Sequence, residues 1–300
     1  MRKRRLVISL VVLLLLVGIT VIVWKVADWP PPRLILKYGF PPTGGPTGRT
    51  RVIEGIEFVE LSPGYVSMRV IGPAARPPLR ERLKAWLGLG PAPSSPAPWP
   101  RWFEFPRRFW IARTEITNLC YETVDPHHER MEDSMEDNSP VVGVSWEEAR
   151  RFCETIAERS GLPIRLPNSS EWEYACRAGS TTKFSFGNSV RDLPRYAWCE
   201  TNSEGRAHAV ATRDANPWGL FDMHGNVAEW CEGGKSYGED AIEAELRGEE
   251  VACGYARRTF RGGDWLWPDQ LCMSDWRSSR DRRYAVNHIG FRPAFSNPDD

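Results

Sequence analysis

The clearest periodic pattern of hydrophobic positions in the chain begins after Ser145. Apolar residues then recur every three or four positions, which is the spacing of one face of an α-helix. Ser145 and Glu148 have the spacing of a capping box, in which each side chain binds the backbone amide of the other residue. Gly161 is a typical residue at a helix C-terminus. The pattern predicts a helix over residues 146–160, with an apolar face of Trp146, Ala149, Phe152, Cys153, Ile156 and Ala157.

The remaining elements are shorter. Two apolar runs around a Pro-Gly turn predict strands at residues 57–61 and 65–70. Short helices are expected through Tyr121 and over residues 169–178. After residue 178, short apolar runs alternate with Gly, Asn, Asp and Pro, which is typical of loops around a small sheet. The pattern therefore predicts an α+β fold with much irregular backbone.

The N-terminus has a different pattern from the rest of the chain. Four basic residues stand within the first five positions, and residues 6–24 are almost entirely apolar. A helix of about 20 apolar residues spans a bilayer, and its basic flank stays on the cytoplasmic side. We expect residues 1–27 to be a single-pass anchor in the cytoplasmic membrane. The lipid bilayer would contact residues 6–24, and the domain would be periplasmic or extracytoplasmic.

A cleaved signal peptide is the alternative for this segment. Lys25 stands where a cleavage site has a small residue, so we expect the anchor to be retained.

Three further segments follow the anchor. Residues 28–51 are rich in Pro and Gly, which predicts an extended linker. Residues 52–298 have the length of one large domain. A Pro-rich insertion at about residues 77–100, with five prolines in the ten residues 91–100, is expected to form a surface loop within it.

Composition narrows the class of protein. The chain has 39 basic residues (Lys and Arg) and 39 acidic residues (Asp and Glu), so its formal net charge is zero. A chain without net charge has no overall positive field to attract a polyanion, and we therefore expect no nucleic-acid partner. Fifty Gly and Pro residues with 14 Trp favour a loop-rich fold over a helical bundle. Seven cysteines include no Cys-x-x-Cys spacing, and their odd number leaves at least one without a partner in the chain.

Five phrases occur in an order typical of one known family. They are Pro140–Trp146, Arg165–Pro167 followed by Glu171–Arg177, Gly219–Trp230, Arg261–Gly263 and Gly290–Arg292. Together they resemble the formylglycine-generating enzyme (sulfatase-modifying factor) family, over about residues 52–296. The resemblance implies a variant of the C-type-lectin-like architecture, which agrees with the α+β pattern.

Active members of that family oxidise a sulfatase cysteine to formylglycine with oxygen and copper(I) held by two cysteines. Soft thiolates select Cu(I). Counting from Gly262, Trp267 stands at the first cysteine position and Cys272 at the second; counting back from Gly290, Cys272 lies off the site. The Ser that follows Gly-Gly in the family is Asp264 here, and an aromatic residue of the family is Ala228. Since the pair is broken on either count, we do not expect copper, and Cys272 is a catalytic candidate without a partner.

The segment Gly219–Trp230 matches the family better. In the family this loop binds calcium, and the resemblance implies Asp222, Glu229 and the carbonyls of Gly225 and Val227 as ligands. Calcium takes six to eight oxygen ligands, and four would come from this loop. The alternative is a loop held by hydrogen bonds, with Asp222 as a cap and Glu229 paired with an arginine.

The family's substrate groove falls at Asp264, Trp265 and Trp267. Exposed aromatic side chains there would bind a peptide or a sugar. Five arginines near the C-terminus could form an anion-binding surface. The alternative is that they form ion pairs with carboxylates of the domain, and that Arg292 is a buried structural residue. These five are Arg277, Arg280, Arg282, Arg283 and Arg292.

Three functions remain from the sequence. The one that we adopt is a membrane-anchored, calcium-stabilised binding or accessory module that has kept the groove, takes a protein or peptide partner there, and has lost the copper site. The first alternative is a copper-dependent oxidase that converts a sulfatase-type cysteine to formylglycine. The second is an enzyme of the same fold with different chemistry, since fold does not decide function.

Overall fold

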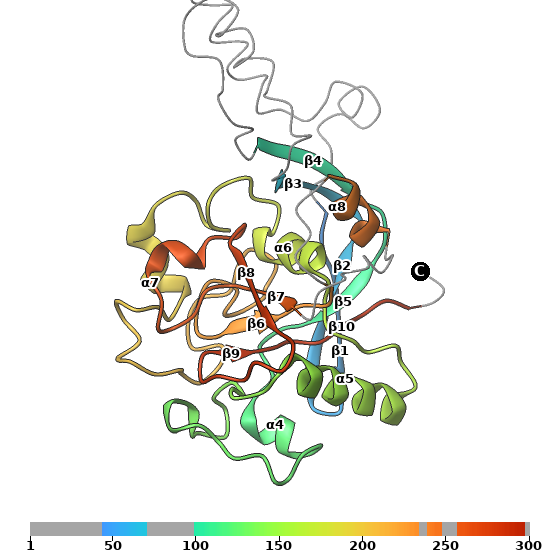
Figure 1. Cartoon of the computed structure of the whole chain (residues 1–300). Coiled ribbons are helices and arrows are strands. Elements are labelled where there is room, and N and C mark those ends of the chain that lie inside the picture. The colour runs from blue at the N-terminus through green and yellow to red at the C-terminus, as the bar shows by residue number, and fades with distance from the viewer. Residues whose placement is uncertain (1–43, 71–98, 234–238, 248–256, 298–300) are drawn as a thin grey trace, which may run out of the picture. The chain divides into compact units, whose positions relative to one another are not determined.

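The structure, a computed structural model, describes residues 44–70, 99–233, 239–247 and 257–297 (Figure 1). The expected anchor at residues 6–24, most of the linker and most of the Pro-rich insertion lie outside these residues. Among the described residues, no helix has both the length and the apolar character needed to cross a membrane. The chain divides into two compact units, and the larger one, residues 42–68 and 103–300, holds the elements that matter for function.

Four antiparallel-paired strands form the first sheet, in the order β1-β2-β5-β10. They are β1 (Gly45–Ile53), β2 (Ile56–Ser62), β5 (Phe109–Ala112) and β10 (Ala294–Phe295). A two-residue turn at Glu54 (φ 50°) and Gly55 (φ 82°) joins β1 to β2, as the twist of a hairpin requires. The last strand of the chain therefore pairs with one from its first half.

The predicted linker boundary differs from the structure. Residues 45–51, assigned to the linker by their Pro and Gly content, belong to β1. This strand is at the edge of the sheet, most of its side chains are exposed, and its register shifts between Pro46 and Thr50. An edge strand with an irregularity tolerates Pro, because one side of its backbone needs no partner.

The second sheet has the order β8-β7-β6-β9, and β6 and β9 are parallel. Its strands are β6 (Ala228–Trp230), β7 (Arg257–Arg261), β8 (Arg277–Asp281) and β9 (Ile289–Gly290). A separate ribbon consists of β3 (Gly64–Val70) and β4 (Trp99–Phe105). The two strands predicted around the Pro-Gly turn are thus present as β2 and β3, but they belong to different sheets.

The main predicted helix is confirmed as α5 (Trp146–Ser160). Both bonds of the Ser145–Glu148 capping box form, and Gly161 ends the helix at φ 70°. The second predicted helix is α6 (Ser169–Arg177), with a capping box of Asn168 and Glu171. Shorter helices are α4 (Asn118–Glu122), α7 (Leu193–Tyr196), α8 (Glu239–Leu246) and the 3-10 turns η1 (Glu132–Ser134), η2 (Val190–Asp192) and η3 (Asp269–Cys272).

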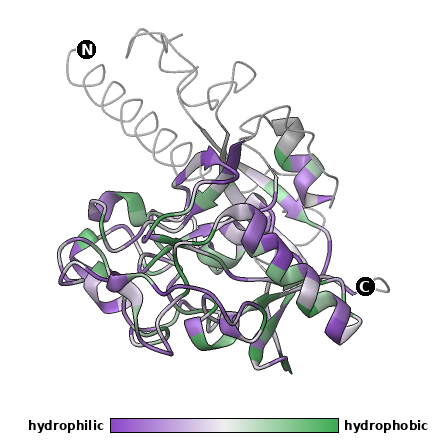
Figure 2. Cartoon of the chain, turned by 60° about the horizontal axis from the view of Figure 1, so that its bottom comes forward, coloured by the Kyte–Doolittle hydropathy of each residue, from purple (hydrophilic) through white to green (hydrophobic). Residues whose placement is uncertain are grey.

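One core connects α5 with both sheets. Phe152 and Ile156 of α5 pack in the same buried cluster as Phe58 of β2 and Trp230 of β6. Two indoles bind across this junction: Trp146 Nε1 donates to the Cys231 carbonyl and Trp230 Nε1 to the Val144 carbonyl, each at 3.0 Å. Hydrophobic and hydrophilic residues alternate at short intervals along the chain (Figure 2), and long irregular segments surround the sheets. The predicted α+β, loop-rich class is confirmed.

Candidate functional site

A cavity of about 280 Å³ lies beside the second sheet, between β7, β8 and the loops that follow them. We call it the groove. Four aromatic side chains line it together with one acid, one arginine and one histidine; these seven are Phe260, Trp267, Trp276, Tyr284, Asp264, Arg280 and His288. An apolar cavity with a few polar groups is typical of a ligand site.

Two glycines direct the chain from β7 into this site. Gly262 and Gly263 have φ of 100° and 73°, a region that disfavours residues with a Cβ. A Cβ on Gly263 would lie 2.7 Å from the sulfur of Cys272 and 2.8 Å from its Cα. The Gly-Gly pair therefore allows the loop containing Cys272 to fold back against the end of β7.

Asp264, a predicted groove residue, lies at the wall of the groove. It is 1% exposed, and its Oδ1 accepts hydrogen bonds from the backbone amides of Leu266 (2.9 Å) and Trp267 (3.0 Å). Burial raises the pKa of this carboxyl to about 7. Asp264 thus shapes the loop that presents Trp267.

Trp267, the second predicted groove residue, is on the rim. Its side chain is 41% exposed, and its ring centroid lies 6.4 Å from that of His288. Leu266 and Tyr284 are also exposed large hydrophobic residues, and the Arg280 guanidinium lies 5.8 Å from the centre of the Tyr284 ring. The groove therefore has an aromatic rim that is accessible from solvent.

The prediction that Trp265 forms an exposed pair with Trp267 is wrong. Trp265 is 5% exposed and packs in a cluster with Val142 and Val227, and its Nε1 donates to the Asn287 carbonyl at 3.2 Å. Sequence could not distinguish the two rings, because this irregular loop has no period that assigns one face to the core.

Cys272 is fully buried behind the groove rather than in its wall. It packs with Cys199, Phe184 and Leu193, and burial, followed by the nearby Cys199, raises its pKa. None of the six described cysteines forms a disulfide. Since the thiolate is the form that binds metal and attacks substrates, the surroundings of Cys272 disfavour both roles.

The groove does not offer the two thiolates that the family's copper ion requires. When the family's two cysteine positions are counted from Gly262, Trp267 stands at the first of them, and it lines the cavity. No cysteine belongs to the cavity wall that the structure describes. The donor set does not fit copper(I), and we derive no chemistry from it.

The predicted calcium loop places Glu229 beside an arginine. Both residues are fully buried, and the Nε and Nη2 atoms of Arg292 each donate to one carboxylate oxygen of Glu229 at 2.7 Å. Trp172 Nε1 adds a third bond to this carboxylate at 2.7 Å. Here the structure has the ion pair named above as the alternative to calcium, and Arg292 is the buried structural residue expected from its motif.

Asp222 has a different environment. Its Oδ2 accepts the Ala211 amide at 2.8 Å, whereas its buried Oδ1 has no partner among the described residues. Desolvation raises its pKa to about 6. No group of three or more His, Cys, Asp or Glu side chains in the described part of the chain is arranged to hold a metal ion. Of the two predicted carboxylate ligands, only Asp222 has an oxygen without a hydrogen-bond partner among the described residues.

Glu115, which was not among the site residues predicted from the sequence, completes this buried cluster. Its oxygens accept the Val227 amide at 3.2 Å and the Asn226 side-chain amide at 3.0 Å. Burial, and then the charges of Asp222 and Glu229, raise its pKa well above the ordinary value. Three buried carboxyls thus share one arginine. Glu115 stands in the polar segment Arg113–Asn118, where nothing in the local pattern marks it as buried.

His224 was also missed, and it connects the predicted calcium loop to the Cys272 loop. Its Nδ1 lies 2.8 Å from the Cys272 carbonyl, and the Ser185 amide donates to its Nε2 at 3.1 Å. Burial lowers its pKa to about 4, so the ring stays neutral. A neutral ring that accepts at Nε2 donates from Nδ1, and the histidine holds Cys272 by its backbone.

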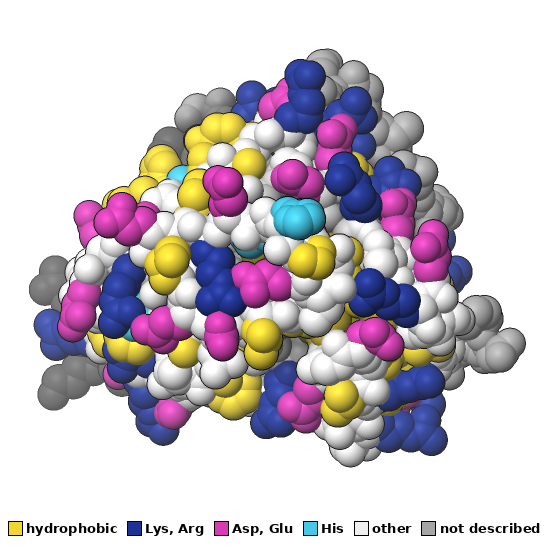
Figure 3. All heavy atoms as spheres, turned by 90° about the horizontal axis from the view of Figure 1, so that it is seen from below, with side chains coloured by type: hydrophobic (Ala, Val, Ile, Leu, Met, Phe, Trp, Pro, Cys, Tyr) yellow, Lys and Arg dark blue, Asp and Glu magenta, His cyan; other side chains and the backbone are white. Residues whose placement is uncertain are grey.

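The arginines near the C-terminus do not form one anion-binding surface. Arg282 pairs with Glu147 at 2.9 Å and Arg283 with Asp281 at 3.3 Å, while Arg280 lies in the groove. On the face shown in Figure 3, acidic and basic side chains are interspersed. This agrees with the neutral net charge of the chain.

Comparison with known proteins decides the family. A family model of the sulfatase-modifying factor enzyme 1-like domain matches residues 101–296, which is most of the chain. The chain belongs to this family. The match includes the groove, the Cys272 loop and the cluster around Glu229, so these features are parts of a sulfatase-modifying-factor domain.

Three curated relatives illustrate the range of the family. The chain is 34% identical to the serine/threonine-protein kinase pkn1 of Chlamydia pneumoniae over 163 residues, 52% of this chain and 24% of that protein. It is 28% identical to the formylglycine-generating enzyme of Streptomyces coelicolor over 174 residues, 52% of each. It is 33% identical to the inactive C-alpha-formylglycine-generating enzyme 2 of Bos taurus over 137 residues, 42% of this chain and 38% of that protein. These alignments span between a quarter and about half of each relative.

A solved structure shows the same fold. The structure of PvdO from Pseudomonas aeruginosa matches with a TM-score of 0.66 at 21% identity, over 84% of this chain and 98% of that one. At this identity the likeness establishes the fold of the sulfatase-modifying-factor domain.

Proposed function

We propose that this chain is a membrane-anchored binding or accessory module of the sulfatase-modifying-factor family that has lost copper oxidation. The observation that carries the proposal is that a tryptophan, and not a cysteine, lines the groove. Trp267, which stands at the family's first copper-cysteine position when counted from Gly262, lines the groove, and Cys272 is buried outside the cavity wall. A rim of exposed aromatic side chains suits a peptide, since aromatic residues dominate binding energy at protein interfaces. The bovine relative named as inactive shows that the family includes members without the enzyme's activity.

A direct test supplies the chain with copper(I), oxygen and a peptide that carries a sulfatase-type cysteine. We expect no formylglycine in the peptide by mass spectrometry. Aldehyde formation that Cys272→Ser abolishes would overturn the proposal in favour of the copper-dependent oxidase. The observation on the side of that alternative is that Cys199 and Cys272 share one buried cluster.

The binding role is tested with a library of extended peptides displayed on a surface. We expect selected peptides to lose at least tenfold in affinity with Trp267→Ala, the loss typical of an aromatic anchor. Leu119→Ala is the matched control, because Leu119 is exposed but does not line the groove. Failure to select any peptide, or equal losses in the two variants, would refute a peptide-binding groove.

We also propose that calcium stabilises the loop through Asp222, Glu229 and the carbonyls of Gly225 and Val227. The unpartnered Oδ1 of Asp222 and the excess of buried carboxyls over arginines support a cation there. Glu229 would contribute a lone pair that Arg292 and Trp172 leave unused. Millimolar calcium is expected to raise the melting temperature of the wild type and not of Asp222→Asn. Equal shifts in both proteins, or none in the wild type, would reject the site.

The membrane anchor remains a proposal from the sequence. We expect the full chain to sediment with membranes and a chain without residues 1–27 to be released. Expression of the full chain followed by recovery of a shortened protein, without its first residues, from the soluble extracytoplasmic fraction would favour the cleaved signal peptide instead.

A further inference from the structure

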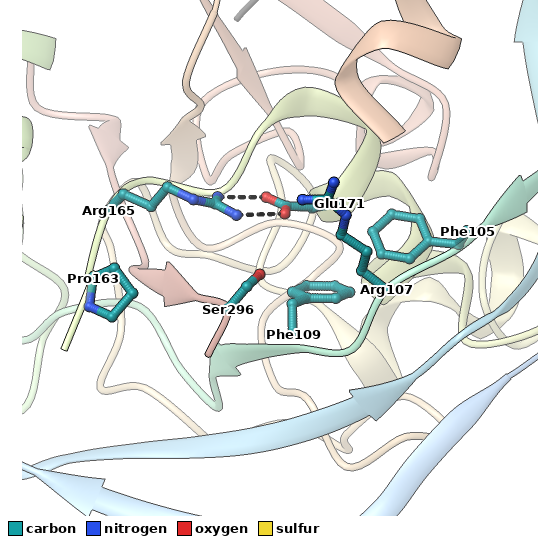
Figure 4. A pocket seen from close by; sticks show the side chains of 7 residues that line it. All are labelled: Phe105, Arg107, Phe109, Pro163, Arg165, Glu171 and Ser296. Carbon is teal, nitrogen blue, oxygen red and sulfur yellow. Dashed lines mark hydrogen bonds and ion pairs between the residues drawn. The ribbon is translucent and has the colours of Figure 1, made fainter. Parts of the chain in front are cut away.

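A second cavity, of about 210 Å³, shares no residue with the groove. Four chain segments meet around it: the end of β4 and the start of β5, the connection between α5 and α6, the first turn of α6, and the residue that follows β10. Its wall combines three apolar side chains with two arginines, one acid and one hydroxyl (Figure 4). These are Phe105, Phe109, Pro163, Arg107, Arg165, Glu171 and Ser296.

The apolar part of the cavity consists of closely packed aromatic rings. Phe105 and Phe109 are almost fully buried, and their ring centroids lie 5.1 Å apart. Phe105 also stacks on Tyr174, with ring centroids 4.4 Å apart and planes 13° apart. Figure 4 shows the Phe109 ring facing the space between the polar side chains. A flat apolar group would find a preformed surface here.

The charges of the cavity leave a surplus of one positive charge. Arg165 and Glu171 form a bidentate pair with both bonds at 2.6 Å. Arg107 also points toward this pair in Figure 4, yet no described residue forms an ion pair or hydrogen bond with its guanidinium. Among the residues that line the cavity, one carboxylate is therefore present for two arginines.

Unused hydrogen-bond donors surround the same space. Arg165 donates two bonds to Glu171 and one to the Leu166 carbonyl, so two of the five guanidinium N–H groups remain. Its side chain is 35% exposed, which keeps these groups accessible. The Ser296 hydroxyl lines the cavity without a hydrogen-bond partner among the described residues. Arg107, Arg165 and Ser296 together form a donor set for an anion.

We propose that this cavity binds a small carboxylate with a flat apolar body, such as an aromatic carboxylic acid. The carboxylate would pair with Arg107, accept from Ser296 and the free N–H groups of Arg165, and lay its ring on Phe109. A planar guanidinium matches a carboxylate in a bidentate way. The volume is below the range of about 300–1,000 Å³ typical of drug-sized ligands, which restricts the occupant to a small molecule.

The test titrates the full chain with benzoate and follows binding by calorimetry, with benzamide as the neutral isostere and inorganic phosphate as an anion without an apolar body. We expect benzoate to bind and benzamide and phosphate to bind at least tenfold more weakly. Arg107→Gln is expected to weaken benzoate at least tenfold, the loss typical of one charge-assisted hydrogen bond. Arg108→Gln is the control, because Arg108 is the exposed neighbour that does not line the cavity.

Four outcomes would overturn the site. They are no binding of benzoate by the wild type, equal losses in Arg107→Gln and Arg108→Gln, equal affinity for benzoate and benzamide, and tighter binding of phosphate than of benzoate. Ser296→Ala, which leaves the charges of the cavity unchanged, is expected to weaken benzoate at least about tenfold, as loss of one hydrogen bond to a charged group does. The peptide groove is independent of these results, because Trp267→Ala should not alter benzoate binding.

Discussion

Arg292 uses every N–H group of its guanidinium in a site without solvent, and its main partner is Glu229. Two bonds of 2.7 Å join the pair, and the remaining donors bind the carbonyls of Ala112, Arg113 and Phe221 at 2.8–3.2 Å. The pair thus connects β6 of the second sheet with the end of β5 in the first. Because both partners are fully buried, either one alone would be an uncompensated charge.

Replacing Arg292 with Leu should therefore destabilise the domain by about 3–5 kcal/mol, the usual cost of removing one partner of a buried ion pair. Denaturant unfolding measures this. Arg283→Leu is the matched control: its ion pair with Asp281 is exposed, and the expected change is within about 0.5 kcal/mol. Similar effects of the two substitutions would show that the buried pair does not hold the sheets together.

Gly263→Ala should be far more costly than Gly55→Ala, although both glycines have positive φ, 73° and 82°. The left-handed conformation alone costs roughly 1–2 kcal/mol for a residue with a Cβ. At Gly55 nothing lies within 4 Å of the added Cβ, whereas at Gly263 it would meet the backbone of Cys272 at 2.8 Å. We expect the loss of unfolding free energy for Gly263→Ala to exceed that for Gly55→Ala by at least about 2 kcal/mol. Equal losses would show that the Cys272 loop moves away easily.

Asp264 should make the domain less stable as pH rises. Burial raises its folded pKa to about 7 from an ordinary value of 3.8, so the folded state holds the proton more strongly than the unfolded chain. Stability contributed by this group is complete below about pH 4 and is lost between pH 4 and pH 7. Asp264→Asn keeps an oxygen for the Leu266 and Trp267 amides and removes the titration.

The measurement for Asp264 is unfolding free energy across pH 4–8. The wild type should lose more stability over this range than Asp264→Asn, by an amount on the order of 3 kcal/mol. Asp192→Asn, at an exposed position, is the control and should follow the wild type. Parallel curves for wild type and Asp264→Asn would contradict the burial of a protonated carboxyl at the groove.

Ser145→Ala removes the first half of the capping box of α5. Ser145 accepts the Glu148 amide at 3.2 Å, and the Glu148 carboxylate accepts the Ser145 amide at 2.8 Å. The expected loss is about 1 kcal/mol, as for other N-caps. Thr155→Ala, at a half-buried position within the same helix, should be neutral or stabilising because Ala is the better helix former. A loss at Thr155 equal to that at Ser145 would argue against the cap.

The helix α5 and its capping box could be predicted because their causes lie within a few residues of one another. Ser145, Glu148 and Gly161 act on neighbouring backbone groups, and the apolar face repeats at the helical period. The motifs around Glu229 and Gly263 likewise identify the family, since they are short and keep their order along the chain. The aromatic groove residue Trp267 could be predicted from its position shortly after the Gly262-Gly263 pair in the family's motif.

The direction of each side chain in the loops, and the partners of the buried charges, came from the three-dimensional arrangement. Trp265 and Trp267 are two positions apart in an irregular segment, yet one packs inside and the other is exposed. Glu229 and Arg292 are 63 residues apart in the sequence, yet they form an ion pair. Arg107 and Ser296 lie near the two ends of the domain in the sequence, yet they line the same cavity. Burial, ion pairing and cavity shape depend on contacts between distant segments, and a pattern of neighbouring residues carries no information about which of those segments meet.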